Sequence, residues 1–370
     1  MKKSDYLQIQ DVKSFTEWLA KIMNNEEPIT FINVHGAAYK FIANAFKSYA
    51  WPEKKNNNIQ NIESELLPLK AKANFAENSK ILEKIQSGLR NALTDASYAS
   101  YATSTMQWGG VTGGNNDWII ENTLDIIERS KEVCEFLNTN DDDVAAWMKG
   151  SNYQNGNLRF NAGFTKVYSL LQDNFVIYDS RVAGALAWLV MIWDSSNEPA
   201  KVNKDHCLAF GCLPAKEGPN AKFNKIRNPD SSIFKQINNP RQHLHWNIRA
   251  SWVLEESIKL AGEKSQHLGI RDIEAALFMI GYDLSGARFV SSAENCFSTL
   301  SNNGGEGIPP SIEVMQTTMK KITKKEKAGQ IFNKNPGLNR QSMIKKFIDE
   351  AQLTVSGAST YFNNFNTNKW

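Results

Sequence analysis

The stretch FVIYDSRVAGALAWLVMIW, residues 175–193, decides how the rest of the chain is interpreted. An apolar segment ends at Tyr178, and Asp179 and Arg181 then stand before an almost wholly apolar run. Because Asp is a preferred N-cap residue, the pattern predicts a helix over 182–193 that Asp179 caps. A helix that is apolar all round is buried on every side. Its N-terminus is therefore expected to open onto something inside the protein or onto a deep cleft.

A second helix start lies just upstream, in NAGFTKVYSLL, residues 161–171. The Asn and Gly residues predict a turn, and the apolar spacing predicts a helix from Phe164. Gly163, Phe164 and Thr165 bring backbone N–H groups to this helix start, and Lys166 adds a cation. This combination is typical of a site that binds a phosphate group.

Helical periodicity recurs along the chain, and strand-like alternation is scarce, so the fold class is expected to be mainly α. Apolar residues with helical spacing form five stripes: Phe15, Trp18, Leu19 and Ile22; Ile81, Ile85, Leu89 and Leu93; Trp118, Ile119, Thr123, Ile126 and Ile127; Trp246, Ala250, Leu254 and Ile258; Ile273, Ala276, Leu277 and Ile280. Two stretches break the pattern. Residues 106–116 are rich in glycine and predict a loop, and residues 197–240 predict a long, irregular surface excursion.

The composition is that of a globular protein: of 370 residues, 41% are hydrophobic and 22% are charged. A net charge of +3 is too small to indicate nucleic-acid binding by itself. The four cysteines are too sparse for a disulfide scaffold and fit a reducing cytoplasm. There is no signal-peptide pattern, and the longest apolar run is too short to span a bilayer. We therefore expect a cytoplasmic protein that does not contact a membrane.

The order of segments predicts a helical core over residues 1–300, a basic linker over 301–337 and a C-terminal unit over 338–370. Residues 311–346 hold nine Lys or Arg and two acids. The last segment shows two helical stripes separated by a polar turn, which is typical of a helix–turn–helix unit: Ile344, Phe347, Ile348 and Ala351, then Tyr361, Phe362 and Phe365. This unit, with Lys345 and Lys346, is expected to contact DNA. A solvated linker is the alternative for the basic run.

NAGFTKVYSLL followed by VIYDSRV resembles the helix–hairpin–helix DNA glycosylase superfamily, particularly its 8-oxoguanine-glycosylase-like branch and its bacterial members linked to defence against phage. The resemblance covers roughly residues 140–285, with Ala276–Gly281 matching a downstream helix. It implies a helix–hairpin–helix core in which Asp179 is the catalytic aspartate. It also implies that Gly163, Phe164 and Thr165 lie in the DNA-gripping hairpin, and that Lys166 matches the lysine that forms a Schiff base with the sugar.

The function that follows is a DNA glycosylase that flips a modified base out of double-stranded DNA and excises it, leaving an abasic site, with weak lyase activity where Lys166 takes part. A fixed carboxylate at Asp179 suits the oxocarbenium-like charge of this reaction. A sugar-bearing pyrimidine of phage DNA is one candidate base, which places the protein in antiviral defence. Gln107, Trp108 and Tyr178 are expected in the base pocket, and Arg181 at a phosphate or beside Asp179. We expect a monomer with no cofactor and no metal.

Several of these residues have plainer interpretations. Asp179 is also interpretable as a helix cap alone, Lys166 as a phosphate contact and the aromatic residues as core. His35 is expected to be a buried core histidine. A set of histidines and cysteines has the residue types of a zinc site, but its spacing is not a standard one: His206, Cys207, Cys212, His243 and His245.

Two other functions stay open at this point. One is a non-catalytic helix–hairpin–helix protein that senses DNA or an abasic site. The other is a structural or partner-binding subunit of a defence system. Salt-sensitive DNA binding without turnover would favour the first, and absence of DNA binding the second.

Overall fold

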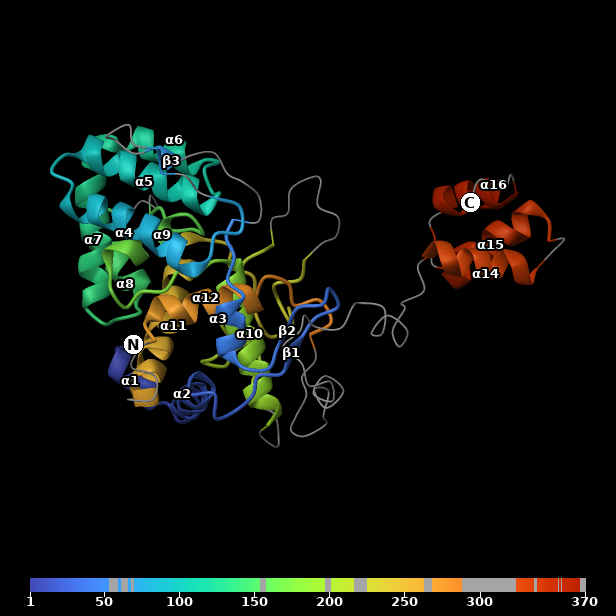
Figure 1. Cartoon of the computed structure of the whole chain (residues 1–370), viewed down its shortest axis with the longest axis horizontal. Helices are drawn as coiled ribbons and strands as arrows, with labels where there is room; N and C mark the ends of the chain where they lie inside the picture. The colour runs from blue at the N-terminus through green and yellow to red at the C-terminus, as the bar shows by residue number, and fades with distance from the viewer. Residues whose placement is uncertain are drawn as a thin grey trace. The chain divides into compact units, whose positions relative to one another are not determined.

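The protein is mainly helical, as its sequence predicts, and the chain divides into two compact units, Met1–Glu294 and Asn295–Trp370 (Figure 1). The computed structural model describes residues 1–52, 59–60, 66–67, 70–153, 158–196, 201–215, 225–262, 268–287, 324–335, 338–351, 353 and 355–366. The strands in these ranges form two short antiparallel pairs: β1 (Phe31–Ile32) with β2 (Ala38–Tyr39), and β3 (Ile59–Gln60) with β4 (Leu66–Leu67).

The helices described in the first unit are α1 (Lys3–Gln8), α2 (Gln10–Met23), α3 (Ile42–Lys47), α4 (Phe75–Asn91), α5 (Asp95–Gly109), α6 (Asn115–Glu121), α7 (Ile126–Asn138), α8 (Val144–Lys149), α9 (Phe164–Leu171), α10 (Ser180–Ser195), α11 (Pro240–Ala261) and α12 (Ile270–Ile280). A 3₁₀ turn, η1 (Thr123–Asp125), joins α6 to α7. In Figure 1, helices α4–α9 gather at one end of this unit, and α2, α3 and α10 lie with the β1–β2 pair at the other.

Polar side chains fix where several of these helices begin. Asn74 and Glu77 form a reciprocal capping box at the start of α4. Asn239 caps α11, and Pro240 follows as its first residue, where a missing N–H costs nothing. The predicted start of the apolar helix is confirmed, because the Asp179 side chain accepts the first N–H groups of α10.

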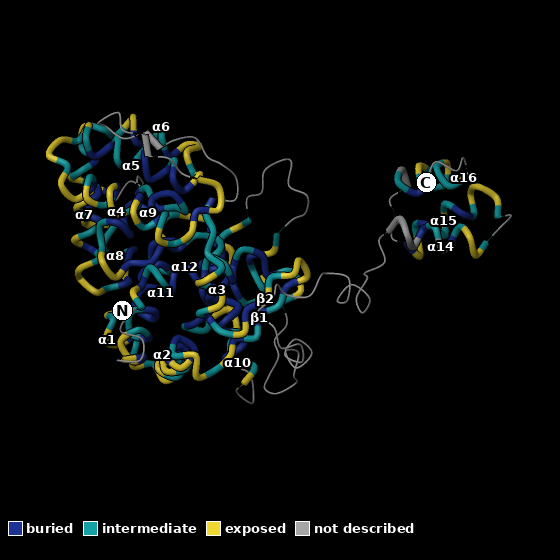
Figure 2. The backbone as a smooth tube through the Cα atoms, viewed as in Figure 1, coloured by how far each residue is buried: buried dark blue, intermediate teal, exposed yellow. Residues whose placement is uncertain are grey.

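The core of the first unit is built around α10, which packs against α12, while α11 packs against α2. The predicted all-apolar helix is buried along its length, and Trp188 at its centre is fully inaccessible to solvent. Figure 2 shows such buried residues gathered inside the unit, with exposed residues on its outer turns. Burial of so much apolar area on both sides makes α10 a rigid element.

Three local predictions were wrong. The predicted loop 106–116 is shorter, because α5 extends to Gly109 and α6 begins at Asn115. Gly110 and Gly114 bracket the remaining loop and both have positive φ, which glycine adopts without strain. Leu93 lies beyond the end of α4 and is 95% exposed, so it is not part of that stripe. The stripe at 118–127 is divided between α6, η1 and α7.

The predicted surface excursion, residues 197–240, contributes several buried residues to the core, although most of its described residues are exposed or half-buried. Phe210 and Phe234 are fully buried, and the two segments that carry them pair with each other. The Cys212 amide donates to the carbonyl of Lys235 at 3.0 Å. Their backbone groups are therefore satisfied without a regular sheet. Residues 197–200 and 216–224 lie outside the described residues.

The second unit contains three described helices: α14 (Lys324–Lys334), α15 (Arg340–Ala351) and α16 (Val355–Asn366). The last two are the helices predicted within 338–370. They share a small core around Ala328, Phe347 and Ala358. The predicted linker 301–337 is therefore helical over α14, and its part up to residue 323 lies outside the described residues. Lys345 is exposed on α15, and Lys346 is half-buried and pairs with Glu350 at 3.0 Å.

In the part of the chain that the structure describes, no helix has the length and apolar character needed to cross a membrane.

Candidate active site

A cleft of about 1550 Å³ opens in the first unit, and the N-termini of α9 and α10 both reach it. Its lining combines aromatic rings with amide side chains: Trp51, Phe75, Trp108, Trp118 and Phe278, and Asn78, Asn115, Asn161, Asn238 and Asn239. Lys166, Asp179 and Arg181 also line it. The expectation that the apolar helix opens onto a deep cleft is thus confirmed.

Asp179 is held in place by the helix that it caps. Its Oδ1 accepts hydrogen bonds from the backbone N–H groups of Arg181 at 2.9 Å and Val182 at 3.2 Å. Oδ2 lies 3.7 Å from Lys166 Nζ. One carboxylate oxygen is therefore committed to the helix, and the other is turned toward the lysine. The capping and functional interpretations of this residue are compatible.

Lys166 belongs to the first turn of α9, yet its side chain is only 6% exposed. Its Nζ donates a hydrogen bond to the carbonyl of Ala162 at 2.6 Å. The aliphatic part of the side chain packs on Gly109, where a Cβ atom would lie 2.7 Å from Lys166 Cδ. The absence of a side chain at Gly109 is what allows the lysine to lie along the cleft wall.

The two groups shift each other's ionisation. Burial lowers the pKa of the Lys166 ammonium, and the negative charge of Asp179 opposes this without cancelling it. Burial also tends to raise the pKa of Asp179, but the charges of Lys166 and Arg181 and two N–H hydrogen bonds outweigh it. The pKa of Asp179 therefore lies below its ordinary value. The site holds an ionised carboxylate beside an amine that loses its proton more readily than a free lysine.

A buried hydrogen-bond network ties the two helix starts together. The Thr165 hydroxyl accepts from the Tyr178 N–H at 3.0 Å and donates to Asn247 Oδ1 at 2.6 Å. Glu274 accepts the N–H of Ile177 at 2.6 Å. These bonds fix the backbone directly before Asp179. Buried polar groups that are fully paired in this way specify one geometry.

The side chains of two residues expected in the DNA-gripping hairpin lie in the core. Thr165 is fully buried, and its hydroxyl is occupied by the network. Phe164 is also fully buried, and its ring packs edge-on against Trp118 with centroids 4.8 Å apart. Neither side chain is accessible to a DNA backbone in this structure. Gly163, by contrast, lines the cleft.

The predicted turn before α9 is supported by two asparagines, Asn161 and Asn115. Asn161 Oδ1 accepts the N–H of Gly163 at 2.8 Å, and its Nδ2 donates to Asn115 Oδ1 at 2.9 Å. The same Asn115 oxygen accepts from Arg159, which also donates to the carbonyl of Gly114. A Cβ atom at Gly163 would lie 2.3 Å from Asn115 Nδ2, so glycine is required by this close approach.

The three residues expected in the base pocket have different positions. Trp108 lines the cleft, and its Nε1 donates to Asn78 Oδ1 at 2.9 Å. Tyr178 is fully buried behind the site, where its hydroxyl donates to the carbonyl of Gly211 at 2.7 Å. Gln107 and Tyr178 are not among the described residues that line the cleft. Trp51, Asn247 and Glu274 were not identified from sequence, because no local pattern marks them.

Arg181 lines the cleft beside Asp179, and its guanidinium is surrounded by aromatic rings. The Cζ atom lies 4.1 Å from the centroid of the Phe278 ring and 4.7 Å from that of Tyr282. The Trp51 ring is at 4.9 Å. A contact of Arg181 with a phosphate stays a prediction.

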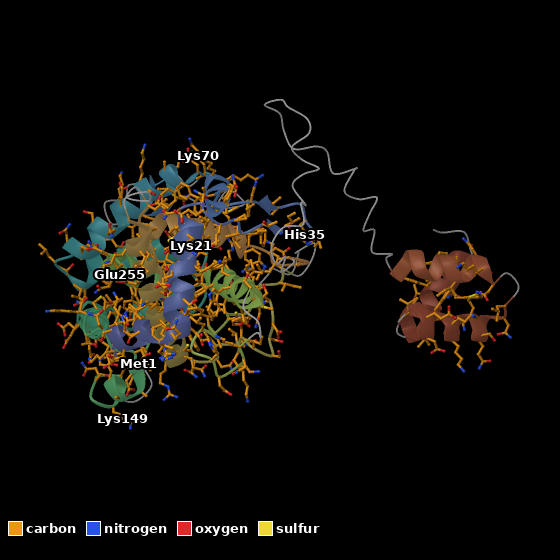
Figure 3. The ribbon with its side chains drawn as sticks, turned by 90° about the horizontal axis from the view of Figure 1, so that it is seen from below. Met1, Lys21, His35, Lys70, Lys149 and Glu255 are labelled. Atoms are coloured by element: carbon orange, nitrogen blue, oxygen red, sulfur yellow. The ribbon has the colours of Figure 1, made fainter. Side chains whose placement is uncertain are left out.

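The histidines and cysteines that have the residue types of a zinc site make separate contacts. His206 pairs with Asp11 at 3.1 Å, while His243 bonds to the Tyr178 carbonyl at 2.6 Å and His245 to that of Asp142. No group of three or more potential ligands converges among the residues that the structure describes. His35 is not a buried core residue: it lies at the edge of the unit, its side chain is 35% exposed, and it pairs with Asp283 (Figure 3).

Comparison with protein-family models, with curated proteins and with solved structures gave no match.

Proposed function

We propose that this protein is a DNA glycosylase of the helix–hairpin–helix type, with Asp179 and Lys166 as its catalytic residues. The observation that carries the proposal is the convergence of these two side chains, 3.7 Å apart, from two helix N-termini at one cleft. A cap that served stability alone would not require a buried lysine beside it, because burying a cation is costly.

Asp179 is suited to stabilise the positive charge that develops on the deoxyribose when the glycosidic bond breaks. Its carboxylate is ionised, is held by two backbone N–H groups and has a low pKa. A preorganised charge in a site of low polarity stabilises such a transition state strongly. In hydrolysis, water bonds to C1′ and gives up a proton, while the C1′–N electron pair and a proton leave with the base.

Lys166 supplies a second route to the same bond cleavage. Its lowered pKa increases the share of neutral amine, the form that attacks C1′. The amine forms a bond to C1′ as the base leaves with the electron pair of the old bond, and loss of a proton and ring opening give a Schiff base. From the Schiff base, loss of the C2′ proton and departure of the 3′ phosphate would break the strand, so this route predicts a weak lyase activity.

The cleft is suited to a neutral guest rather than to a DNA backbone. Six acids and five Lys or Arg residues line it: Glu83, Glu121, Asp173, Asp179, Asp272 and Glu274, and Arg159, Lys166, Arg181, Arg227 and Arg271. Such a balance gives no net attraction for phosphate. A base flipped out of the duplex is uncharged and stacks on aromatic faces. Trp118, which is half-buried, supplies such a ring in the lining.

The size of the cleft supports a bulky modified base. Its volume of about 1550 Å³ exceeds the roughly 300–1,000 Å³ of ordinary small-molecule pockets. A sugar-bearing pyrimidine of phage DNA has a size that such a cleft accepts, and its excision would serve antiviral defence.

The test is release of free base from phage genomes that carry modified or ordinary bases, measured by mass spectrometry. We expect one class of modified genome to lose its base and gain abasic sites. Sodium borohydride added during the reaction is expected to trap a covalent adduct with the native protein and not with Lys166→Gln. If the protein binds these genomes in a salt-sensitive way and releases no base from any, a non-catalytic DNA sensor replaces the enzyme.

A further inference from the structure

Arg181 is held as a fixed cation at the mouth of α10. Its guanidinium lies within 5 Å of three ring centroids, those of Phe278, Tyr282 and Trp51. Cation–π contacts stabilise a guanidinium without neutralising it, as a carboxylate would. The guanidinium also keeps its proton at every physiological pH. These three rings, called the aromatic box below, therefore surround a permanent positive charge.

The backbone of Arg181 is fixed as firmly as its side chain. Its N–H donates to Asp179 Oδ1 at 2.9 Å. Its carbonyl oxygen lies against Gly281, where an added Cβ atom would come within 1.8 Å of it. The start of α10 and the end of α12 thus meet at Arg181, whose backbone is hydrogen-bonded directly to the Asp179 carboxylate.

The other titratable groups around Asp179 come from several different elements. Lys166 faces it from α9, and Glu274, itself paired with Arg271 at 2.6 Å, lies on α12. His243 on α11 has its pKa lowered by burial to about 4, so it is neutral near pH 7. Tyr49 has its pKa raised by burial above its ordinary value and is neutral as well. Arg227 is close by, but its Nη1 donates to Ser180 Oγ at 2.7 Å.

We propose that Arg181 is a positioning residue that keeps Asp179 ionised while Lys166 is neutral. A neutral amine no longer compensates the buried carboxylate, which then tends to take up a proton. The boxed guanidinium supplies the charge that the lysine has given up. The inference rests on the proposed function for the moment at which Lys166 loses its proton, but the electrostatic relationship itself is measurable without substrate.

The experiment follows the Asp179 carboxyl by NMR in protein labelled with ¹³C at aspartate, with Asp179→Asn to assign the signal. Lys166→Met mimics the uncharged lysine, and in this variant we expect Asp179 to stay ionised at pH 7. Addition of Arg181→Met should raise the titration midpoint of Asp179 by at least about one pH unit. If Arg181→Lys is added instead, the shift of the Asp179 midpoint should be smaller, because the positive charge remains while the planar stacking is lost.

Equal Asp179 midpoints in Lys166→Met with and without Arg181 would overturn the inference. If Arg181→Met does not fold, Arg181→Gln provides the same comparison, since its planar amide still stacks in the box without a charge. Base release by the native protein is measured separately. If the Asp179 midpoint shifts but the native protein releases no base, the proposed function is wrong and the role of Arg181 is supported. If the native protein releases base but the midpoint does not shift, the role of Arg181 is wrong and the proposed function is supported.

Discussion

Lys166 Nζ lies 3.7 Å from Asp179 Oδ2, although the two residues begin different helices and both are largely buried. The arrangement depends on supports that do not line the cleft, above all Thr165, Asn247 and the buried part of α10 after Val182. Burying two charges stabilises a protein little, and removing either partner leaves the other uncompensated. The pair is therefore better explained by chemistry than by stability.

The Thr165 hydroxyl gives a first prediction. Thr165→Val should lower the free energy of unfolding by about 1–3 kcal/mol, because it removes the acceptor of the buried Tyr178 N–H and the donor to Asn247 Oδ1. Thr165→Ser keeps the hydroxyl and is the matched control. Urea unfolding measures both. Loss of DNA binding by Thr165→Val with unchanged stability would instead make this residue a direct DNA contact.

Gly163 gives a second prediction. Gly163→Ala places a Cβ atom 2.3 Å from Asn115 Nδ2 and 2.8 Å from Met106 Sδ. Overpacking of this kind costs about 1–3 kcal/mol, and the shift of the turn should also slow base release. Gly113→Ala is the control, since nothing lies within 4 Å of a Cβ atom there. The unfolding temperature and the rate of base release are measured for both variants. Equal unfolding temperatures and equal rates in the two variants would contradict the prediction.

His243 predicts how stability depends on pH. Burial lowers its pKa to about 4, so the unfolded chain binds a proton at a higher pH than the folded protein does. The contribution of His243 to the free energy of unfolding is then fully present above pH 6.5. It is lost as the pH falls from 6.5 toward 4 and amounts to about 3 kcal/mol in all. Urea unfolding at pH 7 and pH 5 tests this. Between pH 7 and pH 5, His243→Gln should lose less free energy of unfolding than the native protein does.

Lys345 and Lys346 of α15 predict salt-dependent DNA binding. Lys345→Gln with Lys346→Gln should weaken binding on all sequences alike, and the slope of log K against log salt should fall by about 0.9 for each phosphate that is no longer neutralised. Lys21 on α2, whose side chain is 57% exposed, gives the control Lys21→Gln. Fluorescence anisotropy over a salt series measures the slope. An unchanged slope would mean that the second unit has another partner.

The elements that the sequence predicted correctly are those with strong local signals. Asp179 before an apolar run and Phe164 after an Asn-Gly turn each marked a helix start that the structure has. Hydrophobic periodicity likewise located α2, α11 and α12. Such signals act within a few residues, so they are readable without knowledge of the tertiary structure.

The parts that the sequence did not predict depend on contacts between distant segments. The aromatic box around Arg181 contains Trp51 and Phe278, which are far apart in the sequence. No pattern in the sequence predicts that they lie next to each other. Thr165 carries the residue type of a DNA contact, but packing against Asn247 turned it inward. The segment with Phe210 and Phe234 has the composition of a surface loop and is nevertheless buried. Tertiary contacts overrode local preference in each case.

The most direct test of the central claim is the single-turnover rate of base release by Asp179→Asn on the DNA that the native protein cleaves. The variant keeps the size and the cap acceptor of the side chain but not its charge. We expect a rate at least about 100-fold below that of the native protein. Asp173→Asn, which alters an 82% exposed carboxylate at the same cleft, should release base at the native rate. Base release by Asp179→Asn at the native rate would contradict the account.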